Sequence, residues 1–505
     1  MEDGRRAGTV AHAGAPEHDE PLSGPVRVGG RERGAHWEDS VRVLGHDGRG
    51  APPRSPLQRS VRQRALAAAA QAARVRQRGS LSHDGRRPAA LPVRVRGRAH
   101  RPADVEAVER HLGHRALETR GAAVHVQQAL HRQRADPLGL SPNVKITQVN
   151  VGVLRVAVDR PYVAGGRTVD ANWHVLARIT TSDGVEGVGY VVYPRPDLMT
   201  TIGHAARELG EHLIGMSVLE PEAAWDRLAR RGDWVGPGGL LHCALAPLDI
   251  AVWDAAGKTL GQPLHRLLGG YRDRLPTYAS DGLWVSLSPA ELAASAKRHV
   301  AGGFGAVKLR LGREATPELE ARRVHAVREA VGPDVRIMVD AVESWSLARA
   351  RRTGRILQEA GIAWLEDPVH HSDVVGLAEL RRQLEVPIAA GEHLYHLDAF
   401  RTLLEARAVD VVILDLARVG GVTPWRKIAA MAQAYRIPVC GHVVPEIQVH
   451  LLSAVPHGHM VEYVPRSAGI LTSMPRVENG ELVAPSGPGL GLALDEAAVR
   501  RYQVA

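Results

Sequence analysis

From Pro276 onward the sequence repeats one pattern eight times: a short apolar run, a polar end, and then an amphipathic helical segment. Strict alternation of short buried strands with helices indicates a parallel sheet whose strands are joined by crossover helices. Eight such units over about 190 residues predict an α/β fold of the (β/α)8 type, a modified TIM barrel. The expected strands are residues 276–280, 305–311, 336–341, 362–366, 387–392, 411–415, 437–442 and 460–464.

Helix starts in this region carry capping signals that fit the alternation. Residues 288–291, Ser-Pro-Ala-Glu, form a capping-box pattern with proline at the first helical position. Thr-Pro pairs at 316–317 and 423–424 repeat the order of cap and then proline. These helices are therefore expected to begin at the proline of each signal.

The region before the barrel has a different texture. Runs rich in β-branched residues at 144–158 and 174–193, the second broken by an Asp-Gly turn at 183–184, predict an antiparallel meander. Helical patterns follow up to the Gly-Gly turn at 269–270. The sequence therefore predicts a separate α+β unit of about 130 residues ahead of the barrel.

The first 142 residues differ again, and they hold the excess positive charge of the chain. Up to residue 144 there are 25 arginines, no lysine and 15 acidic residues, whereas the rest has 39 basic and 40 acidic residues. The segment also lacks Ile, Phe, Tyr and Cys, and it lacks the apolar patterning that a core requires. We expect a disordered or mistranslated Arg/Ala/Gly-rich extension, with a basic arm that binds nucleic acid as the alternative.

Cysteine usage and hydropathy bear on the cellular setting. Two cysteines, Cys243 and Cys440, are too few for a disulfide framework and favour a reducing compartment. The sequence shows no run of about 18 apolar residues, and its N-terminus lacks the continuous apolar stretch of a secretory signal. We therefore expect a cytoplasmic protein with neither a membrane nor a nucleic acid as partner.

Carboxylates end three successive predicted strands: Asp340, Glu366 and Glu392, each 26 residues after the previous one. In a parallel barrel the C-terminal strand ends face one common mouth, where active sites lie. Three converging carboxylates repel one another unless a cation lies between them. A hard divalent ion with oxygen ligands resolves the repulsion, and Mg²⁺ fits best because it keeps positions open for a substrate.

Charged side chains also end the strands across the mouth. Asp415 and His442 end adjacent strands, a separation that suits a carboxylate orienting an imidazole as a general base. Lys308 and Arg310 leave the second strand two residues apart, so both point into the barrel. Because buried cations need anionic partners, the pair predicts a small-molecule substrate that carries a carboxylate or forms an enolate.

These strand-end residues, in this order, resemble those of the enolase superfamily, and within it the mandelate racemase subgroup. The resemblance runs from about Val144 to the C-terminus, and residues 417–428 and 441–457 are most similar to acid-sugar dehydratases. It implies that the three carboxylates bind one Mg²⁺ per subunit and that the Asp-His pair is the catalytic dyad. It also implies that Glu462, at the end of the last strand, is an acid that hydrogen-bonds an enediolate.

The resemblance further implies a domain organisation. Residues 143–270 would be an α+β capping domain, 271–480 the catalytic barrel, and 481–505 a C-terminal segment that returns to the cap. Cap loops near 160–172 and 191–199 would close over the mouth and set specificity. A homo-oligomer is also implied.

The chemistry of the family is removal of the proton α to a carboxylate. Reprotonation then gives a racemase or epimerase of a 2-hydroxy acid, whereas loss of a β-hydroxyl gives a 2-keto-3-deoxy acid. Many members have a second lysine, acting as a base, where this chain has Arg310, and arginine stays protonated. We therefore expect a lyase, an acid-sugar dehydratase in which His442 is the only base, ahead of a racemase. A non-catalytic binding protein on this scaffold is the alternative from another class.

Two further features affect the expected site. Val342 and Glu343 stand where relatives often have Asn and Gln, which predicts altered contacts or an altered substrate preference. The histidines that follow the fourth and fifth strands are expected to be solvated loop residues rather than ligands. These are His370, His371, His393 and His396.

Overall fold

The computed structural model describes residues 144–164 and 167–504, all of which belong to one compact unit of the chain, His111–Ala505. The predicted extension, residues 1–142, lies outside the described residues.

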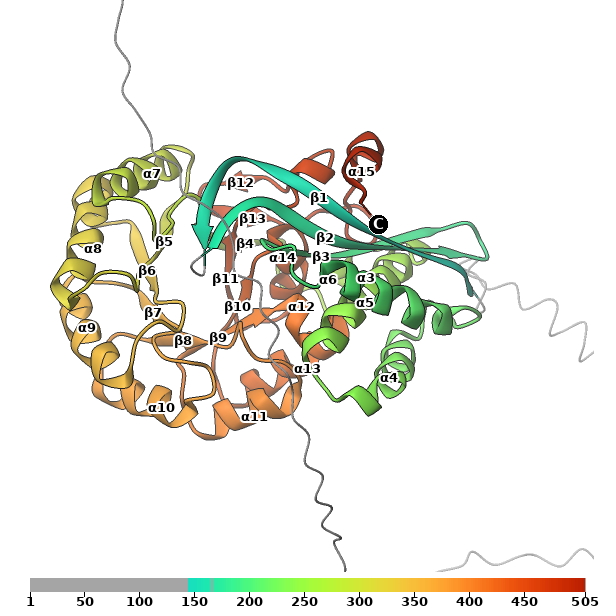
Figure 1. The fold of residues 1–505 in the computed structure, drawn as a ribbon. Coiled ribbons are helices and arrows are strands. Elements are labelled where there is room, and N and C mark those ends of the chain that lie inside the picture. Colours follow the sequence, from blue (N-terminus) through green and yellow to red (C-terminus); the bar gives the residue numbers. More distant parts are fainter. Residues whose placement is uncertain (1–143, 165–166, 505) are drawn as a thin grey trace, which may run out of the picture. The chain divides into compact units, whose positions relative to one another are not determined.

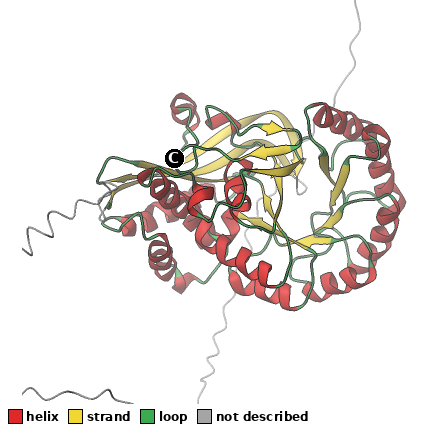
Figure 2. Ribbon diagram, turned by 180° about the vertical axis from the view of Figure 1, so that it is seen from behind, coloured by secondary structure: helices red, strands yellow, loops and turns green. Residues whose placement is uncertain are grey.

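Eight strands pair side by side in the order in which they occur in the sequence, from β4 to β11. Neighbours are parallel throughout, and β11 pairs with β4, which closes the sheet into a barrel. Figure 2 shows these strands in yellow, with red helices outside them. The predicted (β/α)8 class is therefore confirmed. The strands are β4 (Arg274–Ala279), β5 (Ala306–Arg310), β6 (Arg336–Asp340), β7 (Trp364–Glu366), β8 (Ile388–Ala390), β9 (Val411–Asp415), β10 (Val439–His442) and β11 (Gly458–Tyr463).

Two of the three helix starts predicted from capping signals are confirmed. The third prediction is wrong, because that helix begins at Val422 after Gly421, and the Thr423 hydroxyl donates to Asp249 instead of capping it. The Ser288 hydroxyl accepts from the Glu291 amide, and the Glu291 carboxylate accepts from the Ser288 amide. Helix α7 therefore begins with a full capping box. Thr316 caps α8 in the same way through its hydroxyl. Such a cap stabilises a helix by about 1 kcal/mol. Along the chain the helices are α7 (Pro289–Ala301), α8 (Pro317–Val331), α9 (Leu347–Glu359), α10 (Val374–Gln383), α11 (Leu397–Glu405), α12 (Leu416–Val419), α13 (Val422–Ala434) and α14 (Pro445–Ala454).

The barrel strands separate an outer core from an inner one. On β5, Val307 and Leu309 belong to the outer cluster under the helices, whereas Ala306 belongs to the inner cluster with Met338 and Trp364. Because side chains alternate along a strand, Lys308 and Arg310 lie on the inner face with Ala306. The barrel interior is thus apolar at the N-terminal ends of the strands and charged at their C-terminal ends.

The predicted antiparallel meander is present ahead of the barrel, in the order β1-β2-β3. Helix α5 packs on β3 at two glycines: a Cβ on Gly187 would lie 2.3 Å from the Ala251 carbonyl oxygen, and one on Gly189 2.2 Å from that of Pro247. Helix α5 is long and apolar enough to cross a membrane, but 83% of its most apolar window is buried in the fold. The elements are β1 (Ile146–Ala164), β2 (Arg167–Thr181), β3 (Glu186–Tyr193), α3 (Met199–Gly210), η1 (Glu211–Leu213), α4 (Pro221–Arg231), η2 (Asp233–Val235), α5 (Gly239–Thr259) and α6 (Leu264–Leu267).

One predicted loop of this region is a strand hairpin instead. Residues 160–164 continue β1 and residues 167–172 belong to β2 (Figure 1). Tyr162 lies opposite Val169, after a register shift between Ala157 and Tyr162. No sequence pattern indicates pairing here, because Pro161 and the charged residues around it interrupt the alternation. The hairpin is therefore longer than expected.

The C-terminal residues first add two short strands to the barrel strand β4 and then return to β1, ahead of the barrel. Strands β12 (Val477–Glu478) and β13 (Glu481–Val483) add to the edge of β4. After η3 (Ala468–Ile470) and α15 (Glu496–Tyr502), the Val504 amide donates to the Val153 carbonyl of β1 at 2.8 Å. We propose that residues 143–270 act as a cap, 271–480 as the catalytic barrel, and 481–505 as the returning segment.

Candidate active site

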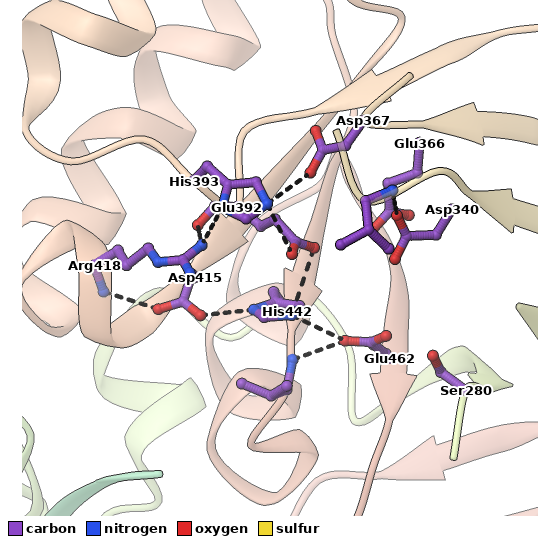
Figure 3. A network of polar contacts seen from close by, with 12 residues as sticks. Ser280, Asp340, Glu366, Asp367, Glu392, His393, Asp415, Arg418, His442 and Glu462 are labelled. Atoms are coloured by element: carbon purple, nitrogen blue, oxygen red, sulfur yellow. Dashed lines mark hydrogen bonds and ion pairs between the residues drawn. The ribbon is translucent and has the colours of Figure 1, made fainter. Parts of the chain in front are cut away.

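The three predicted carboxylates converge at the C-terminal end of the barrel. Asp340 and Glu366 end β6 and β7 in register with each other, and Glu392 follows β8 by two residues. One oxygen from each lies within 4.8 Å of the others, and all three residues are buried. Figure 3 shows them around one space. The barrel register thus brings together groups that are 26 residues apart in the sequence.

The electrostatics of these three carboxylates fit a cation site. Burial raises the pKa of Glu366 to about 8, against the lowering effect of Lys308, and it also raises the pKa of Asp340. Burial acts in the same direction on Glu392, but His442 and His393 outweigh it and hold its pKa below the usual range. Glu392 Oε2 is buried without a hydrogen-bond partner. An all-oxygen donor set of this charge fits Mg²⁺.

His442 and Asp415 form a hydrogen-bonded pair beside the cluster. They end β10 and β9 as register partners, and His442 Nδ1 lies 2.6 Å from Asp415 Oδ2. Because a carboxylate only accepts, Nδ1 carries the proton, and in the neutral ring Nε2 has the free lone pair. Nε2 lies 3.4 Å from Glu392 Oε2. Burial disfavours the imidazolium, but Glu392 and the bond to Asp415 outweigh it and raise the pKa of His442.

Lys308 and Arg310 face the carboxylates from β5. Lys308 is fully buried, with Nζ 2.5 Å from Glu366 Oε1 and 3.0 Å from Glu462 Oε1. Arg310 donates through Nη1 to the Ser280 carbonyl at 2.8 Å and lies 3.8 Å from Asp340. Burial opposes both charges, yet the acidic neighbours prevail and raise the pKa of Lys308 and of Arg310. Both residues are therefore cations in this site.

Glu462, on β11, is the buried anion that these two cations share. Its Oε1 faces Lys308 and lies 3.6 Å from Arg310 Nη2, and its Oε2 accepts from the Val443 amide at 3.0 Å. Burial favours the neutral acid, but Lys308 and then His442 hold the pKa of Glu462 below its usual range. A carboxylate anchor for the cations fits this environment better than the hydrogen-bond donor that the resemblance implies.

The network also contains residues that were not among the predicted site residues, among them Arg418, His393 and Asp367. Arg418 Nη1 donates to the Glu392 carbonyl at 2.6 Å and to His393 Nδ1 at 2.9 Å. His393 therefore keeps its proton on Nε2, which lies 3.5 Å from both Glu392 and Asp367 (Figure 3). The expectation of a solvated loop histidine is wrong for His393, because the loop after β8 turns it inward. Arg418 follows Asp415, the N-cap of α12, by three residues, and this spacing was the available signal.

The backbone at these strand ends is unusual. Val342 and Glu343 have φ values of 47° and 57°, Asp367 has 40°, and Val443 and Val444 have 47° and 39°. Positive φ in β-branched residues is strained and is typical of functional sites. The conformation of Glu343 turns its side chain to His371, whose amide donates to Oε1 at 2.6 Å. Glu343 therefore contacts His371 at the rim of the site, and an effect of the Val-Glu pair on substrate preference stays a prediction.

A cavity of about 890 Å³ opens over the site. Its barrel wall includes Asp340, Glu392 and His442, and its other wall is the segment 192–199 with Leu240. Residues 192–199 therefore lie over the mouth of the barrel, where the second cap loop was predicted. Their closure over a substrate stays a prediction. The hairpin residues 158–162 instead line a neighbouring cavity of about 470 Å³, which shares Trp284 and Arg466 with the first.

Comparison with known proteins agrees with this geometry. Residues 291–498 match the family described as enolase C-terminal domain-like, and residues 148–269 match the mandelate racemase/muconate lactonizing enzyme N-terminal domain. The chain belongs to the enolase superfamily, in the mandelate racemase subgroup. The two matched ranges correspond to the barrel and to the α+β unit ahead of it.

Relatives of this superfamily member include proteins named as dehydratases and cycloisomerases. It is 33% identical to 3,6-anhydro-alpha-L-galactonate cycloisomerase of Streptomyces coelicolor, over 65% of this chain and 91% of that one. It is 31% identical to L-talarate/galactarate dehydratase of Salmonella typhimurium, over 65% and 82%. A crystal structure of L-talarate dehydratase from Polaromonas sp. JS666 with Mg and L-glucarate is similar at a TM-score of 0.69 and 30% identity, covering 72% of this chain and 98% of that one.

Proposed function

We propose that this chain is a Mg²⁺-dependent hydro-lyase that dehydrates an acid sugar, an aldonate or aldarate, to a 2-keto-3-deoxy acid. The observation that carries the proposal is the placement of the Asp415–His442 dyad beside three buried carboxylates, with His442 Nε2 3.4 Å from Glu392. A base and a cation site at this separation can act on one small carboxylate substrate. Relatives named as acid-sugar dehydratases support the substrate class.

Asp340, Glu366 and Glu392 would hold the Mg²⁺. Burial raises the pKa of Asp340 and of Glu366, and Glu392 Oε2 is buried without a hydrogen bond, so the three carboxylates fit a site that binds a cation. Bound there, Mg²⁺ supplies positive charge to the substrate carboxylate and so makes the α-proton more acidic.

His442 is the proposed base and, in the second step, the acid. Its Nε2 takes the α-proton, and the electron pair of the C–H bond becomes the C=C bond of the enediolate. The enediolate then expels the β-hydroxyl, His442 returns the proton to the leaving oxygen, and water departs. The remaining enol tautomerises to the 2-keto-3-deoxy acid. Asp415 keeps Nδ1 protonated throughout and stabilises the imidazolium.

Lys308 and Arg310 are proposed to stabilise the negative charge that develops on the substrate. Their pairing with Glu462 and Glu366 holds both side chains without freedom to swing away. Since Glu462 is itself an anion here, we assign it the task of anchoring these cations.

A racemase or epimerase of a 2-hydroxy acid needs a second base on the opposite face of the substrate. Arg310 stands where a second lysine would be, and Asp340 and Glu462, which outweigh its burial, raise its pKa further. One-base chemistry is therefore the better-supported proposal. Retention of the complete carboxylate cluster and dyad argues against a non-catalytic binding protein.

Setting and assembly are also proposals. Cys243 and Cys440 are both buried free thiols, and burial raises the pKa of Cys440 to about 12, so neither is arranged for disulfide chemistry. This supports a reducing, cytoplasmic location. A homo-oligomer is proposed on the family resemblance.

The test is a screen of the purified chain with Mg²⁺ against a panel of aldonic and aldaric acids, detecting 2-keto-3-deoxy products with semicarbazide. His442→Asn is the matched control, because it keeps the size and polarity of the side chain and removes the base. We expect product from one or a few acids, abolished in the control. Product formation that survives His442→Asn would contradict the mechanism. Silence across the panel, with Mg²⁺ bound, would contradict acid-sugar dehydration.

A further inference from the structure

Arg310 is held in place by the segment that follows the first barrel strand. Its amide donates to the Leu283 carbonyl at 3.1 Å, and its Nη1 donates to the Ser280 carbonyl at 2.8 Å. The guanidinium carbon lies 4.5 Å from the centroid of the Trp284 ring. Three contacts from residues 280–284 therefore fix a cation at the wall of the active-site cavity.

Trp284 also carries a contact from the hairpin ahead of the barrel. Tyr162, near the end of β1, stacks on it with ring centroids 4.1 Å apart and ring planes 11° from parallel. Trp284 is 5% exposed and borders both the active-site cavity and the neighbouring one, whereas Tyr162 lines only the neighbouring one. Tyr162 thus touches the residue that supports Arg310, from outside the substrate cavity.

The three side chains form a unit that depends on arginine. Ring stacking and cation–π contact both depend on how the indole is tilted, so the Tyr162 ring constrains Trp284 and, through it, the guanidinium. A lysine ammonium is compact and cannot lie flat on a ring while donating to the Ser280 carbonyl. Arginine at position 310, where many family members have a second lysine, is therefore the residue that this stack can support.

We propose that Tyr162 and Trp284 are positioning residues: the Tyr162 ring fixes the Trp284 indole, and the indole holds the Arg310 guanidinium for the substrate. The proposal rests on the proposed function for the role of Arg310, and it concerns residues that never touch the reacting atoms. It predicts that Tyr162 matters for substrate binding only while an arginine stands at 310.

The experiment is a double-mutant cycle read by calorimetric binding of tartronate, a small 2-hydroxy dicarboxylate, in the presence of Mg²⁺. Tyr162→Ala is expected to weaken binding about five-fold, as the loss of one aromatic pair implies, whereas Tyr162→Phe keeps the stack and stays close to the unaltered chain. In an Arg310→Met background, Tyr162→Ala is expected to have no further effect. Tyr435→Ala, which removes a half-exposed tyrosine from another cavity, is the control and leaves binding unchanged.

Equal losses from Tyr162→Ala in both backgrounds would overturn the proposal, because they would show a general structural role. Unchanged binding in Tyr162→Ala would overturn it as well. If the unaltered chain binds no tartronate with Mg²⁺ present, the premise that Arg310 serves a 2-hydroxy acid fails. The binding measurements do not require dehydratase activity. Tartronate binding without turnover of any acid sugar would contradict the proposed reaction but not the positioning of Arg310. For an active chain, kcat and KM of the same variants give the second readout.

Discussion

His442 Nδ1 donates to Asp415 Oδ2 across 2.6 Å, between register partners at the ends of two adjacent parallel strands. This bond fixes which ring nitrogen bears the proton, and it leaves Nε2 free to act as a base. The same carboxylate accepts from the Arg418 amide at 2.8 Å, so its orientation is set from a second side.

Replacing Asp415 by Asn should remove this control without changing the shape of the site. The amide group can present its NH₂ to Nδ1, which favours the tautomer whose Nε2 is protonated and cannot take a proton. We expect kcat to fall by about 100-fold or more, the usual contribution of a positioned base. Stopped assays with semicarbazide measure the loss, and Mg²⁺ affinity should stay unchanged. A variant with near-normal kcat would show that His442 does not depend on Asp415.

Mg²⁺ should stabilise the folded chain, because it relieves the repulsion among Asp340, Glu366 and Glu392. At one hundred times its Kd a ligand that binds only the folded state adds about 2.7 kcal/mol to the free energy of unfolding. Denaturant titrations with and without Mg²⁺ measure the gain. Glu366→Gln should lose most of it, whereas Glu379→Gln, at a partly exposed helix position, should keep it. Equal gains in both variants would contradict the assigned ligands.

Arg310→Lys should introduce a group that can lose its proton. The ammonium cannot reproduce the contacts of the guanidinium with Trp284 and Ser280, so we expect kcat/KM to fall roughly ten-fold, as for one lost charged hydrogen bond. Proton exchange at the α-carbon in D₂O, followed by NMR with both epimers of the active acid, should begin to appear from the second face as pH rises. Exchange from both faces in the unaltered chain would contradict one-base chemistry.

Arg418→Gln should weaken metal binding, although Arg418 is not a predicted ligand. Its guanidinium holds the Glu392 carbonyl and fixes the tautomer of His393. Loss of such outer contacts typically lowers metal affinity about 10- to 100-fold. Mn²⁺ binding followed by electron paramagnetic resonance measures it without turnover. Arg401→Gln, at an exposed position on α11, is the control. Equal Mn²⁺ affinity in the two variants would refute a positioning role.

Asp249 should make stability depend on pH. It is buried on α5 and accepts from the Thr423 amide and hydroxyl at 2.8 and 2.6 Å, yet burial raises its pKa to about 7. The folded state therefore binds the proton more tightly than the unfolded chain. Protonation of Asp249 therefore adds to the free energy of unfolding. This stabilisation is fully present below pH 4 and is lost as pH rises to about 7.

Asp249→Asn should remove this dependence of the free energy of unfolding on pH. The free energy of unfolding of the variant, relative to the unaltered chain, should rise by up to roughly 4 kcal/mol between pH 4 and 8, on top of a constant loss from altered bonds to Thr423. Urea titrations across this range give the difference. A difference that does not change with pH would show that Asp249 ionises normally.

Local signals in the sequence were enough for the barrel and for its ring of polar strand ends. Each apolar run is short, each helix has a cap or an amphipathic face, and a parallel barrel turns every strand end to one mouth. Asp340, Glu366 and Glu392 could be grouped from this rule alone. The pairing of residues 160–164 with residues 167–172 could not be predicted, because it depends on a partner strand and not on local alternation.

The contacts of His393, Arg418, Tyr162 and Trp284 were likewise not predicted from the sequence, although the spacing of Arg418 from Asp415 was a weak signal. Each joins elements that lie far apart along the chain, such as the 4.1 Å stack between the hairpin and the loop after β4. Glu462 was found by position, but its ionised state follows from Lys308, which only the closed barrel brings within 3.0 Å.

The sequence by itself determined the fold class, the order of the strands and the identity of the charged residues at their ends, because periodicity and caps are local properties of the chain. The tertiary structure decided which of those charges face one another, which protonation states they hold and which aromatic rings support them. Those properties depend on distances of a few ångströms and on burial, and both are set only when the strands close into a barrel.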